Sequence, residues 1–321
     1  MAKIKNLFKH LPLLISLAAF TAVLFFLIST PQVVRLAESK ISASNEIPSP
    51  IAVMEPEIAG VSKAPVITVK SKDIATPSAS ALGVYAVDMD LDQPLYQKNI
   101  HNRLSMASTT KIMTAIVALK QFKSGEVLIV PPAALVGGSS MGLSAGEQMT
   151  FRSLLYGMLL NSGNDAAYTL AYNYPGGLSN FVAQMNLEAE EMGLKNTHFQ
   201  NPAGFDNYEH YTTAFDMAQI AKEFTRQSLL SKIVATKNTS VISYDKSQQH
   251  LLYNLNKLLG QDGVVGIKTG TTELSGENLV TLVEKDNHRI LIVLLNSADR
   301  FGETKQIMDW IWQNYSWEVS E

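Results

Sequence analysis

The chain has 321 residues, of which 46% are hydrophobic and 17% are charged, and its formal net charge is -3. This is the composition of a folded globular protein, and the slightly negative charge excludes the basic surplus that attracts nucleic acid, so no nucleic-acid partner is expected. The chain contains no cysteine, which excludes disulfide bonds, cysteine-based zinc sites and a catalytic thiolate.

Residues 1–30 have the pattern of a membrane segment. Lys3, Lys5 and Lys9 precede an uncharged apolar run over 11–28, which comes close to the ~20 residues with which a helix crosses a bilayer. No A-x-A cleavage pattern follows directly behind the run, so we interpret the segment as an uncleaved signal anchor. The positive-inside rule then places the lysines in the cytoplasm and the rest of the chain outside it. A cleaved signal, and hence a secreted protein, is the alternative.

Residues 31–80 show no clear period. Pro, Ser, Ala, Ile and Val alternate with scattered charges over this stretch. The pattern predicts an extended and poorly ordered linker, long enough to hold the next domain away from a membrane.

Periodic patterns occupy residues 81–317, which we interpret as one folded domain. Apolar residues at helical spacing predict helices over 109–122, 150–160, 165–173, 178–192, 214–227 and 303–315. Alternating or β-branched runs predict strands over 82–87, 95–98, 232–241, 264–269, 279–284 and 289–295. Strands at both ends with helices between them predict an α+β fold, in which the two ends build one mainly antiparallel sheet and a helical lobe is inserted.

The turn predicted over 88–94 contains Asp88, Asp90 and Asp92, a spacing that begins some calcium-binding loops. Such a loop also needs a central glycine and a final bidentate glutamate, and the chain has Gln93 and Asn99 at those places. We therefore expect a hairpin turn here and no metal site.

The first of three short motifs is Ser108-Thr109-Thr110-Lys111, at the start of a predicted helix. A serine hydroxyl is a poor nucleophile without a base beside it, and side chains three residues apart share one face of a helix. Lys111 can act as that base only if burial or another cation destabilises its ammonium form. The start of a helix also favours the oxyanion that an attack by Ser108 would create.

The Ser-x-x-Lys pattern is weak by itself, because it is expected about once or twice by chance in such a chain. A second copy runs from Ser243 to Lys246, but it follows an alternating strand pattern and opens no helix. We interpret that copy as a solvated strand end. The alternative for Ser108 is a simple helix N-cap, since serine is a favoured cap residue.

The second motif is Ser162-Gly163-Asn164, between two predicted helices. A tight loop there would aim both polar side chains into a cleft, where Ser162 can relay a proton between Lys111 and a leaving amine and Asn164 can hold a peptide amide. The alternative is a loop with an ordinary helix cap.

The third motif is Lys268-Thr269-Gly270, which ends the β-branched run over 264–267. On an edge strand, the lysine and threonine can receive a substrate carboxylate, and the glycine lets the substrate backbone approach closely. The alternative is a strand that ends in a turn.

The three motifs follow one another in an order typical of class A β-lactamases and penicillin-binding proteins. The similarity extends beyond them, and the stretch over 81–315 resembles the D-alanyl-D-alanine carboxypeptidases, the low-molecular-weight penicillin-binding proteins. The runs that carry the resemblance are MASTTKIMTA (106–115), NSGNDAA (161–167), NPAGF (201–205), TTAFDMA (212–218) and GIKTGTT (266–272).

The resemblance implies a β-lactamase and penicillin-binding-protein transpeptidase-like fold. It implies that Ser108 attacks the bond between the two terminal D-alanines of a peptidoglycan stem pentapeptide, and that Lys111 takes the serine proton. Three further residues would complete the proton and electrostatic network: Ser162, Asn164 and Lys268.

On the substrate side, the resemblance implies that Thr269 and Gly270 border the bound peptide and that Thr269 holds its carboxylate. Backbone N–H groups of Ser108 and Thr271 would form the oxyanion hole. Arg300 is similar to a family arginine that assists at the carboxylate, with a plain surface arginine as the alternative. The expected partners are peptidoglycan stem peptides and, as covalent inhibitors, β-lactam antibiotics; no metal or cofactor is implied.

Two departures from the family pattern are expected to matter. The chain ends soon after Tyr315, so we expect neither a second, β-rich domain nor a C-terminal amphipathic membrane helix. Thr271 stands where relatives often have histidine, which bears on the substrate preference.

Three alternatives remain at this point. A D,D-endopeptidase would use the same residues to cut cross-links. A β-lactamase would need a further carboxylate, usually in a Glu-x-x-Leu-Asn loop, which the sequence lacks, and the middle motif has Gly163 where aspartate is usual. A non-catalytic wall-binding module would have no use for the nucleophile Ser108.

Overall fold

The computed structural model describes residues 65–70 and 74–319. The predicted signal anchor over 1–30 and most of the predicted linker, 31–64 with 71–73, lie outside these residues. Among the residues described, no helix combines the length and the apolar character that crossing a bilayer requires.

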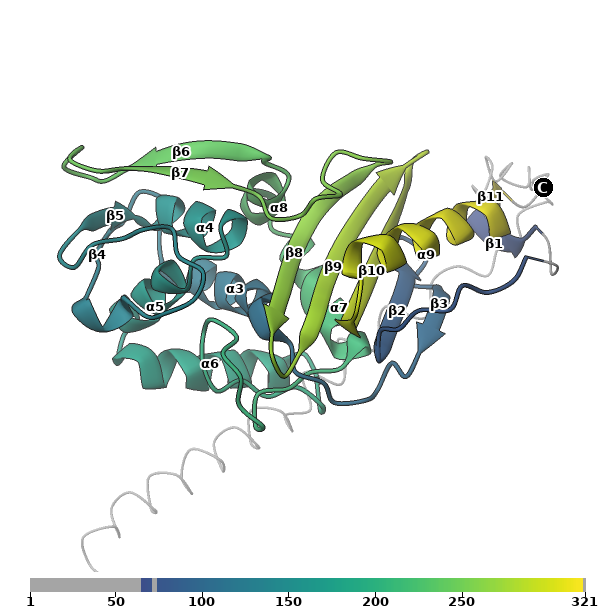
Figure 1. Cartoon of the computed structure of the whole chain (residues 1–321), viewed down its shortest axis with the longest axis horizontal. Coiled ribbons are helices and arrows are strands. Elements are labelled where there is room, and N and C mark those ends of the chain that lie inside the picture. Colours follow the sequence, from purple (N-terminus) through teal and green to yellow (C-terminus); the bar gives the residue numbers. More distant parts are fainter. Residues whose placement is uncertain (1–64, 71–73, 320–321) are drawn as a thin grey trace, which may run out of the picture. The chain divides into compact units, whose positions relative to one another are not determined.

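A five-stranded antiparallel sheet lies at the centre of the folded unit, with the strand order β3-β2-β10-β9-β8 (Figure 1). Its strands come from both ends of the domain, as the sequence predicts: β2 (Gly83–Asp88), β3 (Pro94–Lys98), β8 (Val264–Thr272), β9 (Gly276–Lys285) and β10 (His288–Ser297). Strand β8 is an edge strand on the side of the helical lobe, so no other strand of this sheet pairs with its outer side.

The alternation of side chains along the sheet builds two cores. On β10, Leu291 and Val293 face the core shared with the helical lobe, whereas Ile290 and Ile292 face a second core. Helix α9 (Arg300–Asn314) covers this second face of the sheet (Figure 1). Because both faces are covered, apolar side chains point to both sides of central strands such as β10.

The helical lobe is inserted between β3 and β8, as predicted. Its α-helices and 3-10 helices are η1 (Ala107–Thr110), α3 (Lys111–Gln121), η2 (Pro132–Ala134), α4 (Phe151–Leu160), α5 (Asn164–Asn173), α6 (Gly177–Glu191), α7 (Ala214–Thr225) and α8 (Ser228–Val234). Two small sheets accompany them, β4 (Val127–Ile129) with β5 (Gln148–Thr150) and β6 (Asn238–Ile242) with β7 (Gln249–Tyr253). The starts of α4 and α7 are fixed by the side chains of Thr150 and Thr213, which accept hydrogen bonds from backbone N–H groups.

The strand predicted over 232–241 is wrong in its first part. Residues 232–234 form the last turn of α8, and the strand β6 begins only at Asn238. Leu230, Ile233 and Val234 are all buried in the lobe core. Their spacing suits a helix face, so tertiary packing overrides the β preference of the branched side chains.

The ordered unit also begins before residue 81. Within the stretch predicted as a linker, Pro65–Val69 forms strand β1, which pairs antiparallel with β11 (Tyr315–Val319). Ile67 is buried with Trp317 packed against the same core. The sequence pattern did not predict this strand, because its period is weak and its pairing partner lies at the other end of the chain.

The hairpin predicted between β2 and β3 is confirmed. The Oδ1 atom of Asp88 accepts hydrogen bonds from the backbone N–H groups of Asp90 and Leu91 at 2.9 and 2.8 Å, which closes the turn. Across the described ranges, no group of three or more acidic or histidine side chains is arranged to hold a metal ion.

Candidate active site

Ser108 lies in η1, the 3-10 turn that leads into α3. The N-cap position is occupied by Met106, so the alternative of a capping role for Ser108 is wrong. Ala107 has a positive φ of 44°, and this turn aims the Ser108 side chain at Lys111, where Oγ and Nζ are 2.9 Å apart. The two side chains therefore meet as the i, i+3 spacing predicts.

Lys111 is fully buried, with an exposed fraction of 0%. Its Nζ atom donates hydrogen bonds to Asn164 Oδ1 at 2.8 Å and to the Ala203 carbonyl oxygen at 2.6 Å. Burial, reinforced by the charge of Lys268, lowers the pKa of Lys111 well below its ordinary value, and Asp165 opposes the effect. A neutral amine has two N–H donors and one lone pair. Since two fixed acceptors take both donors, the lone pair is left for Ser108.

The loop over 201–205 supplies the Ala203 carbonyl, a contact that sequence reasoning missed. Asn201 Oδ1 accepts from the backbone N–H groups of Ala203, Gly204 and Phe205 at 3.2, 2.7 and 3.0 Å. Gly204 has a φ of +94°, and an added Cβ atom would lie 1.9 Å from the Ala107 carbonyl oxygen. The NPAGF run marks this loop in the sequence, but no side chain in the run indicates that a backbone carbonyl oxygen accepts a hydrogen bond from Lys111.

The Ser-Gly-Asn motif forms the turn between α4 and α5, and Asn164 from this turn contacts Lys111. Ser162 has a positive φ of 60° and is buried. Asn164 donates from Nδ2 to the Gly137 carbonyl oxygen at 2.9 Å. That bond fixes which end of the amide faces Lys111, and it is the oxygen.

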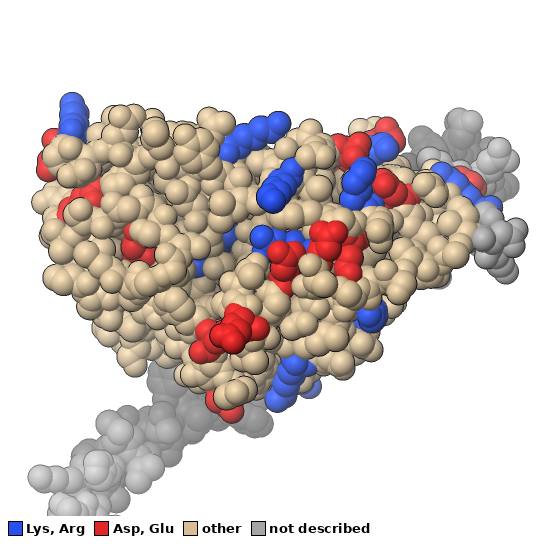
Figure 2. Space-filling model, in the orientation of Figure 1, with Lys and Arg blue, Asp and Glu red and all other residues tan. Residues whose placement is uncertain are grey.

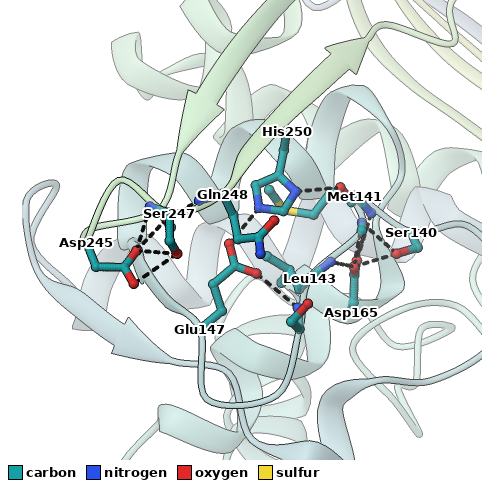
Figure 3. A network of polar contacts seen from close by, with 12 residues as sticks. Ser140, Met141, Leu143, Glu147, Asp165, Asp245, Ser247, Gln248 and His250 are labelled. Atoms are coloured by element: carbon teal, nitrogen blue, oxygen red, sulfur yellow. Dashed lines mark hydrogen bonds and ion pairs between the residues drawn. The ribbon is translucent and has the colours of Figure 1, made fainter.

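Asp165 anchors the segment that wraps around this turn (Figure 3). Its carboxylate accepts from the backbone N–H groups of Met141, Gly142 and Leu143 at 3.0 Å each, and from Ser140 Oγ at 2.5 Å. Buried backbone donors of this kind must be paired. The carboxylate thereby holds the wall of the site next to Asn164.

A buried pair, Glu147 and His250, fastens the same wall to strand β7 (Figure 3). His250 Nε2 lies 2.6 Å from Glu147 Oε1, and His250 Nδ1 lies 3.1 Å from the Met141 carbonyl oxygen. Both ring nitrogens thus face atoms that only accept hydrogen bonds. The imidazole ring is therefore held at both of its nitrogens, which ties this wall to β7.

Strand β8 brings the third motif to the opposite side of the cleft. Lys268 is 2% exposed, and Thr269 and Gly270 are also buried. Burial, followed by the charge of Arg300, lowers the pKa of Lys268 to about 7. A Cβ atom at Gly270 would lie 3.0 Å from the Ser108 backbone nitrogen, so the strand passes closely over the turn that carries Ser108.

Arg300 joins this side of the site, so the alternative of a plain surface arginine is wrong. Its Nη1 atom donates to the Gly270 carbonyl oxygen at 2.8 Å and also to Thr271 Oγ1. Its Nε atom lies 4.0 Å from Glu277 Oε2. As the first residue of α9, Arg300 links the helix that covers the sheet to the edge strand.

The second Ser-x-x-Lys copy lies elsewhere and lacks this geometry. Ser243 and Lys246 occupy the turn between β6 and β7, and Lys246 has a positive φ of 64°. Ser243 Oγ donates to Asp245 Oδ1 at 2.7 Å, so the hydroxyl serves the turn. The two copies differ in the backbone that presents them.

A pocket of about 500 Å³ lies next to the end of β8. Its lining residues are Asp206, Asn207, Tyr208, Glu273 and Leu274. Thr272 Oγ1 donates to Asp206 Oδ1 at 2.6 Å, which joins the end of β8 to the loop after Phe205. Figure 2 shows acidic and basic groups interspersed over the face that it draws, with neither kind gathered into a broad patch there.

Comparison with known proteins shows which family the chain resembles. The family model described as D-alanyl-D-alanine carboxypeptidase matches residues 69–299. The D-alanyl-D-alanine carboxypeptidase DacF of Bacillus subtilis is 32% identical over 256 residues, covering 77% of this chain and 65% of the relative. DacC of Escherichia coli is 30% identical over 264 residues, with the same two coverages. The chain thus spans slightly less than two thirds of these relatives.

The solved structures give the same result for the fold. The crystal structure of the Streptomyces K15 DD-transpeptidase is similar with a TM-score of 0.71 at 30% identity, covering 75% of this chain and 100% of that one. The predicted α+β fold of the penicillin-binding proteins is therefore confirmed. With the family model matching most of the chain, the protein belongs to the D-alanyl-D-alanine carboxypeptidase family.

Proposed function

We propose that the chain is a serine-type D-alanyl-D-alanine carboxypeptidase, which removes the terminal D-Ala of peptidoglycan stem pentapeptides through an acyl-enzyme on Ser108. The observation that carries the proposal is the buried Lys111 amine, 2.9 Å from Ser108 Oγ, with both of its donors occupied by Asn164 and Ala203. A base without free donors and with a lowered pKa is what a serine nucleophile needs.

In the proposed acylation, Lys111 takes the hydroxyl proton of Ser108 as Oγ attacks the carbonyl carbon of the penultimate D-Ala. The backbone N–H groups of Ser108 and Thr271 stabilise the negative charge on the carbonyl oxygen. The C–N bond then breaks, and the proton passes through Ser162 to the leaving amine. Free D-Ala departs, and the shortened peptide stays on Ser108 as an ester.

The proposed substrate lies along the free edge of β8 as an added antiparallel strand. Its terminal carboxylate meets Lys268, Thr269 and Arg300, where two cations gather beside a hydroxyl donor. The acyl part runs the other way, past Thr271. Asn164 holds a peptide amide on the opposite wall.

Deacylation reverses the same chemistry with water as the nucleophile. Water loses its proton to Lys111 and attacks the ester, and the proton returns to Ser108 Oγ as the acyl group leaves. β-Lactam antibiotics, whose ring carries an amide beside a carboxylate, are proposed to acylate Ser108 by the same route and to act as covalent inhibitors.

Product analysis tests the proposal. We expect free D-Ala from a stem pentapeptide, with loss of one residue detected by mass spectrometry. A cross-linked dimer serves as the second substrate, and its cleavage without D-Ala release would show a D,D-endopeptidase instead. A glycine acceptor serves as the third condition, because the similar K15 protein is named a DD-transpeptidase. A transfer product in excess of hydrolysis would favour that activity over carboxypeptidase action.

We also propose that the chain is exported and tethered to the membrane by residues 1–30. The lysine cluster followed by the apolar run over 11–28 supports this proposal. The expected result is that full-length protein stays with membranes at alkaline pH and that external protease removes the domain from intact spheroplasts. Release of the domain by a wash without protease would contradict the tether.

A further inference from the structure

His210 is buried close to the nucleophile, yet the proposed reaction gives it no role. It is 2% exposed and lies in the loop between α6 and α7. Its Nδ1 atom accepts a hydrogen bond from the backbone N–H of Gln200 at 2.9 Å, and its Nε2 atom lies 2.7 Å from Thr110 Oγ1. Both ring nitrogens therefore form hydrogen bonds within the protein.

These contacts fix the direction of each hydrogen bond. Because Nδ1 accepts from a backbone N–H, the proton of a neutral imidazole must be on Nε2. Nε2–H then donates to Thr110 Oγ1, and the Thr110 hydroxyl donates onward to the Ala107 carbonyl oxygen at 2.7 Å. Burial, followed by repulsion from His198, lowers the pKa of His210 to about 4, so the imidazole is neutral around pH 7.

The Ala107 carbonyl, which is the last acceptor in this series of hydrogen bonds, belongs to the same peptide unit as the Ser108 N–H, the proposed oxyanion donor. The carbonyl of Ala107 and the N–H of Ser108 are parts of one planar trans peptide and point in opposite directions. Ala107 holds an unusual positive φ of 44° in this turn. Whatever fixes the Ala107 carbonyl therefore also fixes the direction of the Ser108 N–H.

We infer that His210 is a positioning residue, which orients the Ser108 oxyanion donor through the Thr110 hydroxyl and the Ala107 carbonyl. The neighbouring packing is consistent with a unit that has little freedom. A Cβ atom at Gly204 would overlap the Ala107 carbonyl oxygen at 1.9 Å, and one at Gly270 would lie 3.0 Å from the Ser108 nitrogen. The inference rests on the proposed acyl transfer, since an oxyanion donor matters only in such a reaction.

The test compares variants that remove and preserve the hydrogen bonds. His210→Phe keeps a ring without its nitrogens, and Thr110→Val keeps the shape without the hydroxyl. His210→Gln retains one acceptor and one donor, and Thr110→Ser retains the hydroxyl. Thr304→Val is the matched control, because Thr304 is buried under the sheet and its Oγ1 has no hydrogen-bond partner among the residues that the structure describes.

Three quantities are measured for each protein: the rate constant of acylation at saturating penicillin, the dissociation constant of the complex that precedes it, and the affinity for a peptide boronic acid. The boronate adduct is tetrahedral and places an oxygen in the oxyanion hole. We expect His210→Phe and Thr110→Val to slow acylation about 10- to 100-fold. This decrease in rate is no larger than the one that follows when a single oxyanion donor is removed. Boronate affinity should fall in step, while the initial dissociation constant changes less than about twofold.

The rescue variants should recover most of the rate, and the double variant His210→Phe with Thr110→Val should be no slower than the worse single variant, because both act on one carbonyl. Wild-type acylation in Thr110→Val would overturn the inference, as would slower acylation without weaker boronate binding. Thr110→Val decides the matter if His210→Phe does not fold. Absence of acylation in the wild type would instead refute the proposed function.

Discussion

Arg300 donates from Nη1 to the carbonyl oxygen of Gly270 at 2.8 Å, which sets a permanent cation against the strand that carries Lys268. Burial and this guanidinium together lower the pKa of Lys268 to about 7. Near neutral pH, the combined charge of the two residues therefore changes with one proton.

The first prediction concerns activity against pH. The value of kcat/KM for a substrate with a free carboxylate should fall as the pH rises through about 7 to 8, because neutral Lys268 attracts the carboxylate less strongly. Bound carboxylate favours the charged lysine, so kcat should fall at a higher pH than kcat/KM. Lys268→Arg remains charged and should shift the decline to more alkaline pH. An unchanged alkaline limb in that variant would assign the decline to another group.

The second prediction concerns stability. The folded-state pKa of Lys268 lies below the ~10.4 of an unfolded lysine, so the unfolded chain binds more protons between these values. Below about pH 7, the burial of Lys268 should therefore lower the free energy of unfolding by its full amount. Between about pH 7 and about pH 10 this loss should shrink, so the free energy of unfolding should rise with pH. Lys268→Met should remove this slope and stabilise the protein at pH 6 by on the order of 4 kcal/mol. Denaturant titrations at several pH values measure both effects, and parallel curves would contradict the assignment.

The third prediction tests the loop that holds Ala203. Gly204→Ala should destabilise the protein by several kcal/mol and slow acylation at least about tenfold, because the new methyl group collides with Ala107 and displaces the acceptor of Lys111. Gly193→Ala is the control, since Gly193 also has a positive φ, +73°, but open space beside it. Its cost should be about 1 kcal/mol from backbone strain alone, with acylation unchanged. Equal effects of the two substitutions would show that close packing at Gly204 is unimportant.

The fourth prediction concerns the pair that fastens strand β7. Glu147→Gln replaces the carboxyl group opposite His250 and should destabilise the fold by about 1 to 2 kcal/mol, because an uncharged amide makes a weaker hydrogen bond with the buried ring than a carboxylate does. Denaturant unfolding at pH 7 measures the loss. Glu191→Gln is the control, since Glu191 lies on the exposed surface at the end of α6. A loss no larger than that of the control would contradict a stabilising role for the contact between Glu147 and His250.

The order of the motifs and the helical spacing were enough to predict the sheet built from two chain ends, the inserted lobe and the residues that surround Ser108. These features depend on local patterns and on side chains with distinctive chemistry. Strand β1 was missed because five residues with no clear alternation become a strand only by pairing with β11. Residues 232–234 were wrongly predicted as part of a strand, because Ile233 and Val234 favour a strand by residue type. In the structure, packing against buried neighbours stabilises a helix there instead.

Backbone contributions to the site were harder to predict. The Ala203 carbonyl and the tautomer of His210 follow from three-dimensional contacts that sequence spacing does not encode. Arg300 could be predicted only in part. Its residue type is suited to binding a carboxylate, but its contact with Gly270 depends on where α9 begins relative to β8. The side chains of the motifs could thus be predicted, whereas the groups that orient them could not.

The central claim is that Ser108 is the acylated nucleophile, and intact-protein mass spectrometry with a fluorescent penicillin tests it most directly. Ser243→Ala is the matched control, because Ser243 begins the other Ser-x-x-Lys copy in the chain. We predict one adduct on the wild type and on Ser243→Ala, located by digestion to the peptide that contains Ser108, and no adduct on folded Ser108→Ala. An unlabelled wild type, or a Ser108→Ala variant that still forms the adduct, would contradict the account.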